Sequence, residues 1–285
     1  MRHRTQFSPN WRVILIFIFV SFFILLITKS FIVSSPSSSS SFHPRLSPSN
    51  LREKCSLQSC NKLPTSVAKS LIHYSTSSII PQQTIREISV TLKILDKKSP
   101  SNFLVFGLGH DSLMWHTLNY GGKTVFLEED EAWIQQIKRR FPILESFHVS
   151  YDSKVNQASQ LMEVGKGPEC TSISDPRYSM CQLALKGLPS VVYEVQWDLI
   201  MVDAPTGYHE EAPGRMAAIY TAGMMARNRE DGGETEVFVH DVNRVVEDQF
   251  SNAFLCEGYM KKQEGRLRHF TIPSYRTNLE MPFCP

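Results

Sequence analysis

Glycines and carboxylates follow two apolar runs in a spacing that suits a nucleoside ligand. The run 103–106 leads into a Gly-Leu-Gly turn at 107–109, and the run 124–127 leads into two glutamates. A glycine turn lets a ligand approach the backbone because no Cβ intervenes. A carboxylate at the end of the second strand can accept hydrogen bonds from both hydroxyls of a ribose. The pattern predicts half of a nucleoside-cofactor site, unless it is an ordinary strand-to-helix turn; its candidate residues are Gly107, Gly109, Glu128 and, as the alternative ribose ligand, Glu129.

The charge at this turn favours a cationic cofactor. A dinucleotide fingerprint has a third small residue at the helix start, close to the pyrophosphate. Ser112 takes that place here, and Asp111 just before it would repel a pyrophosphate. S-adenosylmethionine lacks phosphate and carries an ammonium and a sulfonium group. The turn therefore favours S-adenosylmethionine over NAD, with Asp111 among the cofactor-binding candidates.

Strand-like and helix-like segments alternate along most of the chain. This alternation predicts a mostly parallel sheet with helices on both faces, that is, an α/β fold. The irregular stretch 150–190 is expected to be a long excursion over the cofactor. The predicted strands are 103–106, 124–127, 146–149, 197–203 and 236–239, with an antiparallel pair in 258–272, and the predicted helices are 64–74, 81–97, 111–118, 131–140 and 216–227.

Three further polar residues stand at the ends of predicted strands. Asp203 ends the strand after the excursion, and His240 and Asp241 end the next one. Ligands of open parallel sheets gather at the carboxyl ends of the strands, so these residues should share one rim with the glycine turn. We predict that Asp203, His240 and Asp241 are catalytic, as proton acceptors or metal ligands. The alternatives are a helix N-cap for each aspartate and a structural role for the histidine.

The N-terminal part of the chain predicts a membrane anchor. Arginines 2, 4 and 12 precede an apolar segment, 13–33, that is just long enough to span a bilayer. Arginines on that side place the N-terminus in the cytosol, which makes the protein a single-pass type II membrane protein. A cleaved signal peptide is the alternative. Residues 34–60, rich in Ser and Pro, are expected to be a stem, and 61–285 a lumenal domain.

Charge and cysteine content narrow the function classes further. A formal net charge of +2 gives no argument for nucleic-acid binding. All six cysteines follow the anchor, and an even number in a lumenal domain suits disulfides. The sequence cannot choose among the possible pairings. We expect near neighbours to pair: Cys55 with Cys60, Cys170 with Cys181, and Cys256 with Cys284.

Four long motifs resemble plant glucuronoxylan 4-O-methyltransferases, the family also known as domain of unknown function 579. They are 103–115, 124–133, 198–208 and 237–244, and the likeness runs from about Cys60 to Cys284. The resemblance implies a Rossmann-like class I methyltransferase fold, S-adenosylmethionine as donor, a Golgi location and 4-O-methylation of glucuronic acid side chains of glucuronoxylan in the plant cell wall. The family also contains arabinogalactan methyltransferases and a xylan-assembly branch without a settled activity.

The resemblance also suggests a divalent metal ion. Metal-dependent catechol-type methyltransferases have an Asp after the fourth strand, which Asp203 matches, and an Asp-Asn pair after the fifth. Asp241 and Asn243 match that pair imperfectly, with one residue between them. The metal ligands would be Asp203 and Asp241; without a metal, Asp203 or His240 would be the base.

An anionic uronate substrate calls for cationic and aromatic partners near the rim. Arg215 and Arg244 can bind a carboxylate in bidentate fashion, and Tyr208 can stack on a sugar. The alternative is that the arginines pair with nearby acids such as Glu210 or Glu211. Competing functions fit less well, because the chain has no Asp-x-Asp for a metal-bound nucleotide sugar and a pure scaffold needs no acidic rim.

The predicted topology can be tested directly. Because residues 61–285 should lie in the lumen, protease added to sealed Golgi vesicles should leave this domain intact until detergent is added. Digestion without detergent would overturn the type II topology together with the expectation of disulfides.

Overall fold

A computed structural model describes residues 63–276 and 281–285 of the chain. The predicted cytosolic tail, membrane anchor and stem, residues 1–60, lie outside the described residues. Among the described residues, no helix has the length and apolar character needed to cross a membrane. Residues Asn61–Pro285 form one compact unit.

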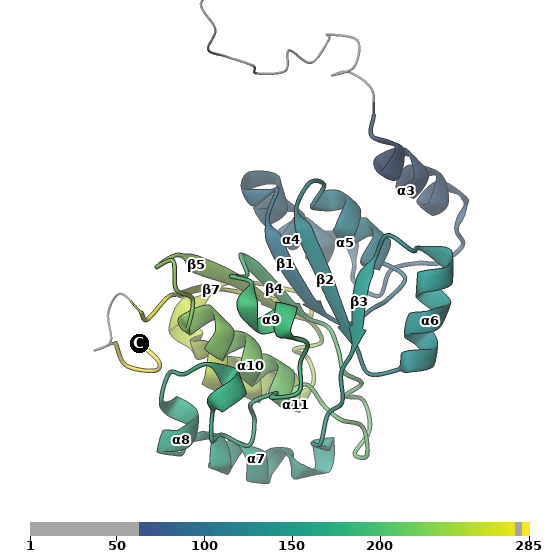
Figure 1. Ribbon diagram of the computed structural model, residues 1–285. Coiled ribbons are helices and arrows are strands. Elements are labelled where there is room, and N and C mark those ends of the chain that lie inside the picture. Colours follow the sequence, from purple (N-terminus) through teal and green to yellow (C-terminus); the bar gives the residue numbers. More distant parts are fainter. Residues whose placement is uncertain (1–62, 277–280) are drawn as a thin grey trace, which may run out of the picture. The chain divides into compact units, whose positions relative to one another are not determined.

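One seven-stranded sheet forms the centre of this unit, in the order β3-β2-β1-β4-β5-β7-β6 (Figure 1). The first five strands are parallel, and β7 runs antiparallel to both β5 and β6. The expected Rossmann-like methyltransferase fold and its antiparallel closing pair are therefore confirmed. The strands are β1 Asn102–Phe106, β2 Lys123–Glu128, β3 Glu145–His148, β4 Leu199–Val202, β5 Glu234–Val239, β6 Met260–Glu264 and β7 Leu267–Pro273.

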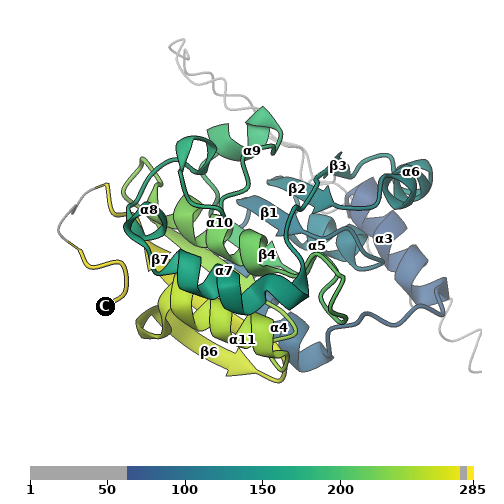
Figure 2. The ribbon, with the colours of Figure 1, turned by 90° about the horizontal axis from the view of Figure 1, so that it is seen from below.

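Helices flank the sheet on both sides (Figure 2). They are α3 Thr65–Thr76, α4 Ile85–Lys98, α5 Ser112–Leu118, α6 Glu131–Arg140, α7 Ala158–Gly165, α8 Pro168–Thr171, α9 Ser190–Glu194, α10 Met216–Arg227 and α11 Val245–Phe250, the last followed by a π-helical stretch, Ser251–Cys256. The predicted start of α4 near Pro81 is wrong. Thr84 is the N-cap instead, because its hydroxyl accepts from the Glu87 amide while the Glu87 carboxylate accepts from the Thr84 amide.

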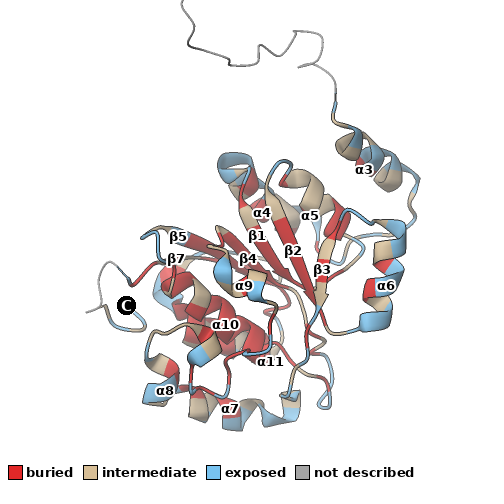
Figure 3. Cartoon of the chain, in the orientation of Figure 1, coloured by how far each residue is buried: buried red, intermediate tan, exposed pale blue. Residues whose placement is uncertain are grey.

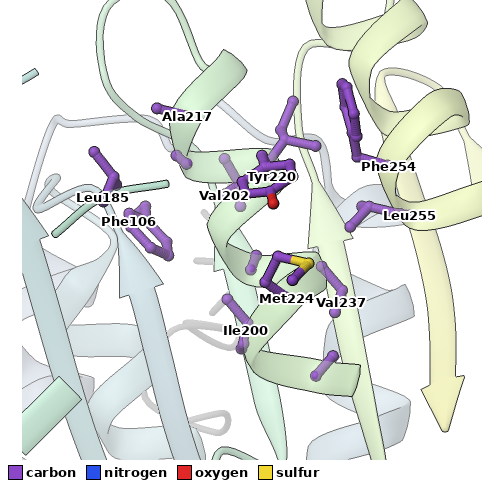
Figure 4. Packing of buried hydrophobic residues seen from close by; sticks show 14 of the residues in the cluster. Phe106, Leu185, Ile200, Val202, Ala217, Tyr220, Met224, Val237, Phe254 and Leu255 are labelled. Atoms are coloured by element: carbon purple, nitrogen blue, oxygen red, sulfur yellow. The ribbon is translucent and has the colours of Figure 1, made fainter. Parts of the chain in front are cut away.

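The central strands β1, β2, β4 and β5 are buried on both faces, which explains their apolar runs (Figure 3). On one face, Phe103, Phe126 and Met201 belong to a cluster with residues of α4, α5 and α6. On the other face, strand residues pack against α10, α11 and the π-helical stretch. Figure 4 shows Val202 and Val237 close to Tyr220 and Met224 of α10. This double burial fixes the sheet, and with it the rim that carries the site.

The excursion 150–190 is more helical than expected. It contains α7, α8 and α9 and packs against α10, where the Tyr220 hydroxyl donates to the Cys170 carbonyl (2.9 Å) and Thr221 Oγ1 accepts from the Leu185 amide (3.0 Å). None of its residues lines the main cavity described below, and the expected position over the cofactor stays a prediction. Apolar residues of this segment pack against the large apolar face of α10.

Two of the expected disulfides are confirmed. Cys170 is bonded to Cys181 and Cys256 to Cys284. The first closes the excursion on itself, and the second ties the end of the chain to the π-helical stretch. The expected pair Cys55–Cys60 lies outside the described residues.

The parallel register brings the predicted site residues to one edge. Phe106 lies opposite Leu127 on one side and Val202 on the other, and Val202 lies opposite Val239. The next residue of each strand or turn is therefore at the same level. These residues are Gly107, Glu128, Asp203 and His240.

Candidate functional site

A cavity of about 490 Å³ opens at this edge of the sheet. Its size lies within the range typical of cofactor sites. With the exception of His240, every residue predicted to belong to the site lines it: Gly107, Gly109, Asp111, Glu128, Glu129, Asp203, Tyr208, Arg215, Asp241 and Arg244. The structure thus gathers the residues of four separate motifs around one space.

The glycine turn has a backbone that requires glycine. Gly107 has a φ of 126°, and a Cβ at this position would lie 3.3 Å from the Cβ of Ala204. Gly109 donates its amide to Ser112 Oγ at 2.9 Å. Ser112, which replaces the third glycine of a dinucleotide fingerprint, therefore holds the turn in shape.

Glu128 stabilises the glycine turn through hydrogen bonds to backbone amides, so its carboxylate is not free to extend into the cavity. One of its carboxylate oxygens accepts from the Leu108 amide (3.0 Å), and the other accepts from the amides of Glu129 (3.0 Å) and Asp130 (3.1 Å). Burial, followed by the neighbouring charge of Glu129, raises the pKa of Glu128 to about 7. Its two oxygens are already bonded to backbone, so Glu128 is a poorer ribose ligand than its neighbour.

Glu129 has one oxygen to spare. Its Oε1 accepts from both the amide (2.8 Å) and the hydroxyl (3.0 Å) of Thr206. Its Oε2 is buried without a hydrogen-bond partner among the described residues. Because Glu129 also lines the cavity, the geometry favours Glu129, the alternative candidate, as the ribose ligand.

Asp111 lies at the start of α5 and contributes a second acidic group to the same cavity. Its Oδ2 accepts from the indole nitrogen of Trp115 at 2.9 Å. Burial, followed by the charge of Asp203, raises the pKa of Asp111 to about 6. A cationic ligand beside Asp111 would lower that pKa again, which is the charge match expected for S-adenosylmethionine.

Asp203 faces the cavity, with His240 behind it. His240 is fully buried, its Nδ1 is 2.9 Å from Asp203 Oδ1, and its Nε2 has no hydrogen-bond partner among the described residues. Gln83 donates to the other oxygen of Asp203 at 3.2 Å. Burial raises the pKa of Asp203, but the hydrogen bond from His240 and the charge of Arg215 outweigh it and hold the pKa below its ordinary value. Asp203 is therefore the ionised group that a substrate can reach, and His240 orients it.

Asp241 is surrounded by three guanidinium groups. Its carboxylate lies 2.9 Å from Arg215, 2.9 Å from Arg244 and 2.7 Å from Arg266. Its backbone is left-handed, with a φ of 63°, a conformation that Asp tolerates better than most residues. The geometry therefore makes Asp241 an anchor for three arginines.

Arg215 is the centre of this cluster and is buried. Its guanidinium donates to the carbonyls of Pro205 (3.2 Å) and His240 (2.8 Å) and lies 3.3 Å from Asp203 Oδ1. The alternative that the arginines pair with acids is confirmed, but the partners of Arg215 are Asp203, Asp241 and Glu247 instead of Glu210 or Glu211. Arg215 also lines the cavity, but these bonds hold its nitrogens in the scaffold, so it is poorly placed to bind a substrate carboxylate.

The other two predicted substrate residues are more accessible. Arg244 pairs with Asp241 and Glu247, yet 29% of its side chain is exposed. Tyr208 is 76% exposed at the cavity wall. Both therefore present accessible side chains at the cavity wall.

Sequence reasoning missed four residues of the cluster. Gln83 precedes α4 and Arg266 lies between β6 and β7, so only the tertiary fold brings them to Asp203 and Asp241. Glu87 lies 3.9 Å from the His240 ring, and the buried Glu247 lies near Arg215 and Arg244. Glu87 is marked in the sequence only as part of a helix capping box with Thr84, and no local motif marks the other three.

The predicted metal ligands do converge, but they are already paired. Ligand atoms of Asp203, His240 and Asp241 lie within 4.8 Å of one another, and carboxylate oxygen with imidazole nitrogen suits a divalent cation. The three arginines around Asp241 would repel such a cation. Asn243, the other half of the expected motif, is exposed and does not line the cavity.

Comparison with known proteins identifies a family and several relatives whose sequences are similar to this chain. The sequence model of the family described as IRX15/IRX15L/GXM matches residues 86–270. The chain is 66% identical to Glucuronoxylan 4-O-methyltransferase 1 of Arabidopsis thaliana, covering 100% of both chains. It is 50% identical to Arabinogalactan O-methyltransferase 2 of that plant, over 76% of this chain and 77% of the relative. It is 36% identical to Protein IRREGULAR XYLEM 15 of the same plant, over 79% of this chain and 71% of that protein.

We expect that removing the central charge of this cluster, the guanidinium of Arg215, strongly destabilises the fold. Arg215→Ala should lower the free energy of unfolding by about 3–5 kcal/mol, because buried carboxylates lose their partner. Lys123→Ala, which breaks the more exposed pair with Glu145, is the control and should cost under about 1 kcal/mol. Urea unfolding of both variants measures the difference. Equal losses would show that Arg215 does not hold the cluster together.

Proposed function

The chain belongs to the IRX15/IRX15L/GXM family, and we propose that it methylates the 4-hydroxyl of glucuronic acid side chains on glucuronoxylan, with S-adenosylmethionine as the donor. One observation carries this proposal. A single cavity joins a glycine turn with acidic neighbours to a reachable ionised carboxylate, Asp203, and a partly exposed guanidinium, Arg244. These are the parts that a cationic donor and an anionic sugar acceptor require.

The donor half of the cavity would hold the nucleoside and the positive charge. When bound, S-adenosylmethionine supplies an electrophilic methyl group. Gly107 and Gly109 leave backbone open to the ligand, and Glu129, which lines the cavity, offers a carboxylate to a ribose hydroxyl. Asp111 offers a carboxylate for the positive end of the donor.

The acceptor half would place the uronate by its charge. In glucuronic acid the carboxylate is attached to C5, next to the carbon that bears the 4-hydroxyl. The group that binds the carboxylate must therefore lie close to the group that takes the hydroxyl proton. Arg244 and Asp203 line the same cavity and are linked through Arg215 and Asp241. Tyr208 offers an exposed ring for stacking on a sugar.

Asp203 is the proton acceptor in this proposal. A sugar hydroxyl is a weak acid and needs a positioned base to react as a nucleophile. Arg215 and His240 keep Asp203 ionised and fix its orientation, while Asp241 keeps the arginines in place. In the metal-dependent alternative, Asp203 and Asp241 would bind a divalent cation, and the arginines near Asp241 would have to yield to it.

Two competing assignments, arabinogalactan as acceptor and a non-enzymatic role, have weaker support. Identity is higher to the relative named for glucuronoxylan than to the one named for arabinogalactan, and only the former match covers the whole chain. Identity to Protein IRREGULAR XYLEM 15 is lower still. A non-enzymatic role would also leave unexplained why buried arginines and carboxylates line a cavity. Glucuronoxylan is therefore the preferred acceptor.

We further propose that the protein is a single-pass type II protein of the Golgi membrane with its folded domain in the lumen. The two disulfides of the described domain support this location, because disulfides persist in oxidising compartments and are rare in the cytosol.

The experiment that tests the function is a methyl-transfer assay on the purified protein. Labelled S-adenosylmethionine is offered with glucuronoxylan and, separately, with arabinogalactan, and the product sugar is identified by NMR. We expect 4-O-methylglucuronic acid on glucuronoxylan, at a rate at least about tenfold above that on arabinogalactan. A chelator is added in a parallel series. Activity that is lost and then returns with a divalent ion would favour the metal alternative, and no transfer to either polymer would overturn the proposed function.

A further inference from the structure

The loop between β4 and α10 is bonded to the acidic end of β2. Thr206 of this loop donates both its amide (2.8 Å) and its hydroxyl (3.0 Å) to Glu129 Oε1. Both residues line the cavity. Glu129, in the part of the cavity proposed to bind the donor, is thus hydrogen-bonded directly to the loop that lines the part proposed to bind the acceptor.

The second oxygen of Glu129 is left without a protein partner. Glu129 Oε2 is buried and has no hydrogen bond among the described residues. A buried carboxylate oxygen without a partner is costly, so a ligand hydroxyl that reaches it would gain a strong hydrogen bond. Such a bond would also hold the carboxylate plane, and with it the oxygen that faces Thr206.

The loop that Thr206 belongs to carries acceptor-side residues. Tyr208 lies two residues further along and is exposed at the cavity wall. The loop is closed by a hydrogen bond from the Gly214 amide to the Thr206 carbonyl (2.9 Å) and by one from Arg215 to the Pro205 carbonyl (3.2 Å). A change in the position of the Glu129 carboxylate would therefore move Thr206, and with it the loop that carries Tyr208.

We propose that Thr206 is a positioning residue that couples the two substrates: a donor hydroxyl bound at Glu129 fixes the Thr206 loop and thereby tightens binding of the glucuronic acid acceptor. This inference rests on the proposed function, because it needs a nucleoside donor and a sugar acceptor in one cavity. The coupling is reciprocal, so each ligand raises the affinity for the other by the same factor.

Tyr151 provides the competing explanation for the free oxygen. Its hydroxyl is also buried without a partner among the described residues, and burial, followed by the charges of Glu129 and Glu128, raises its pKa. The protonated hydroxyl could bond to Glu129 Oε2 in place of a ligand. Tyr151→Phe removes that possibility without touching Thr206.

The test is calorimetry of an acceptor, a glucuronic acid-substituted xylan oligosaccharide, with and without S-adenosylhomocysteine. This product of the donor keeps the nucleoside but has no methyl group to transfer. For the wild-type protein we expect S-adenosylhomocysteine to tighten acceptor binding by about fivefold. Thr206→Val has the same shape without the hydroxyl, keeps the backbone bond to Glu129 and should reduce the factor to below about twofold. Thr206→Ser restores the hydroxyl and should restore the factor.

The control variant is Tyr151→Phe, and each result that would contradict the inference can be recognised separately. Tyr151→Phe should leave the factor unchanged; its loss there would assign the role to Tyr151 and overturn the inference. A factor that is equal in Thr206→Val and wild type, or near one in the wild type, would also overturn it. Methyl transfer by the wild-type protein is measured alongside. If transfer is present while the coupling is absent, only the inference has failed and the proposed function stands. Absence of transfer would remove the proposed function and the inference together.

Discussion

The buried guanidinium of Arg215 is the interaction on which the site depends. It bonds to backbone after β4 through Pro205 and to backbone after β5 through His240, and it lies between the carboxylates of Asp203 and Asp241. Isolated buried charges cost several kcal/mol each, so none of these groups is tolerated there alone. Together they fix the two strand ends and keep Asp203 ionised. The orientation of the Asp203 carboxylate, the proposed base, is thus a consequence of charge pairing inside the fold.

The donor half is organised by a carboxylate as well, but through backbone amides. Glu128 accepts from the amides of Leu108, Glu129 and Asp130, which joins the glycine turn to the end of β2. This leaves Glu129 to face the cavity and to hold Thr206. Two neighbouring glutamates therefore have different tasks: the first shapes the turn, and the second links the donor half to the acceptor half.

Most of the fold could be predicted from the sequence because the central strands β1, β2 and β4 are apolar runs that end at Gly107, Glu128 and Asp203. The helices 131–140 and 216–227 lie where they were predicted: the first has an Asp130 cap and an apolar stripe, and the second is a largely apolar segment buried nearly all round. The site could be predicted only where it follows strand ends. Gln83 and Arg266 come from turns far away in the chain, and nothing local marks them. The roles of Glu128 and Asp241 depend on which amides and guanidiniums surround them, which only the tertiary structure shows.

The central claim is that Asp203, held ionised by its buried neighbours, takes the proton of the acceptor hydroxyl. The most direct measurement is the turnover number of Asp203→Asn at saturating S-adenosylmethionine and glucuronoxylan. Asparagine fills the same space and removes the charge, so donor affinity should change less than about twofold while turnover falls at least about 100-fold, the lower range for loss of a general base. A turnover close to that of the wild-type protein in this variant, with its fold intact by circular dichroism, would contradict the account.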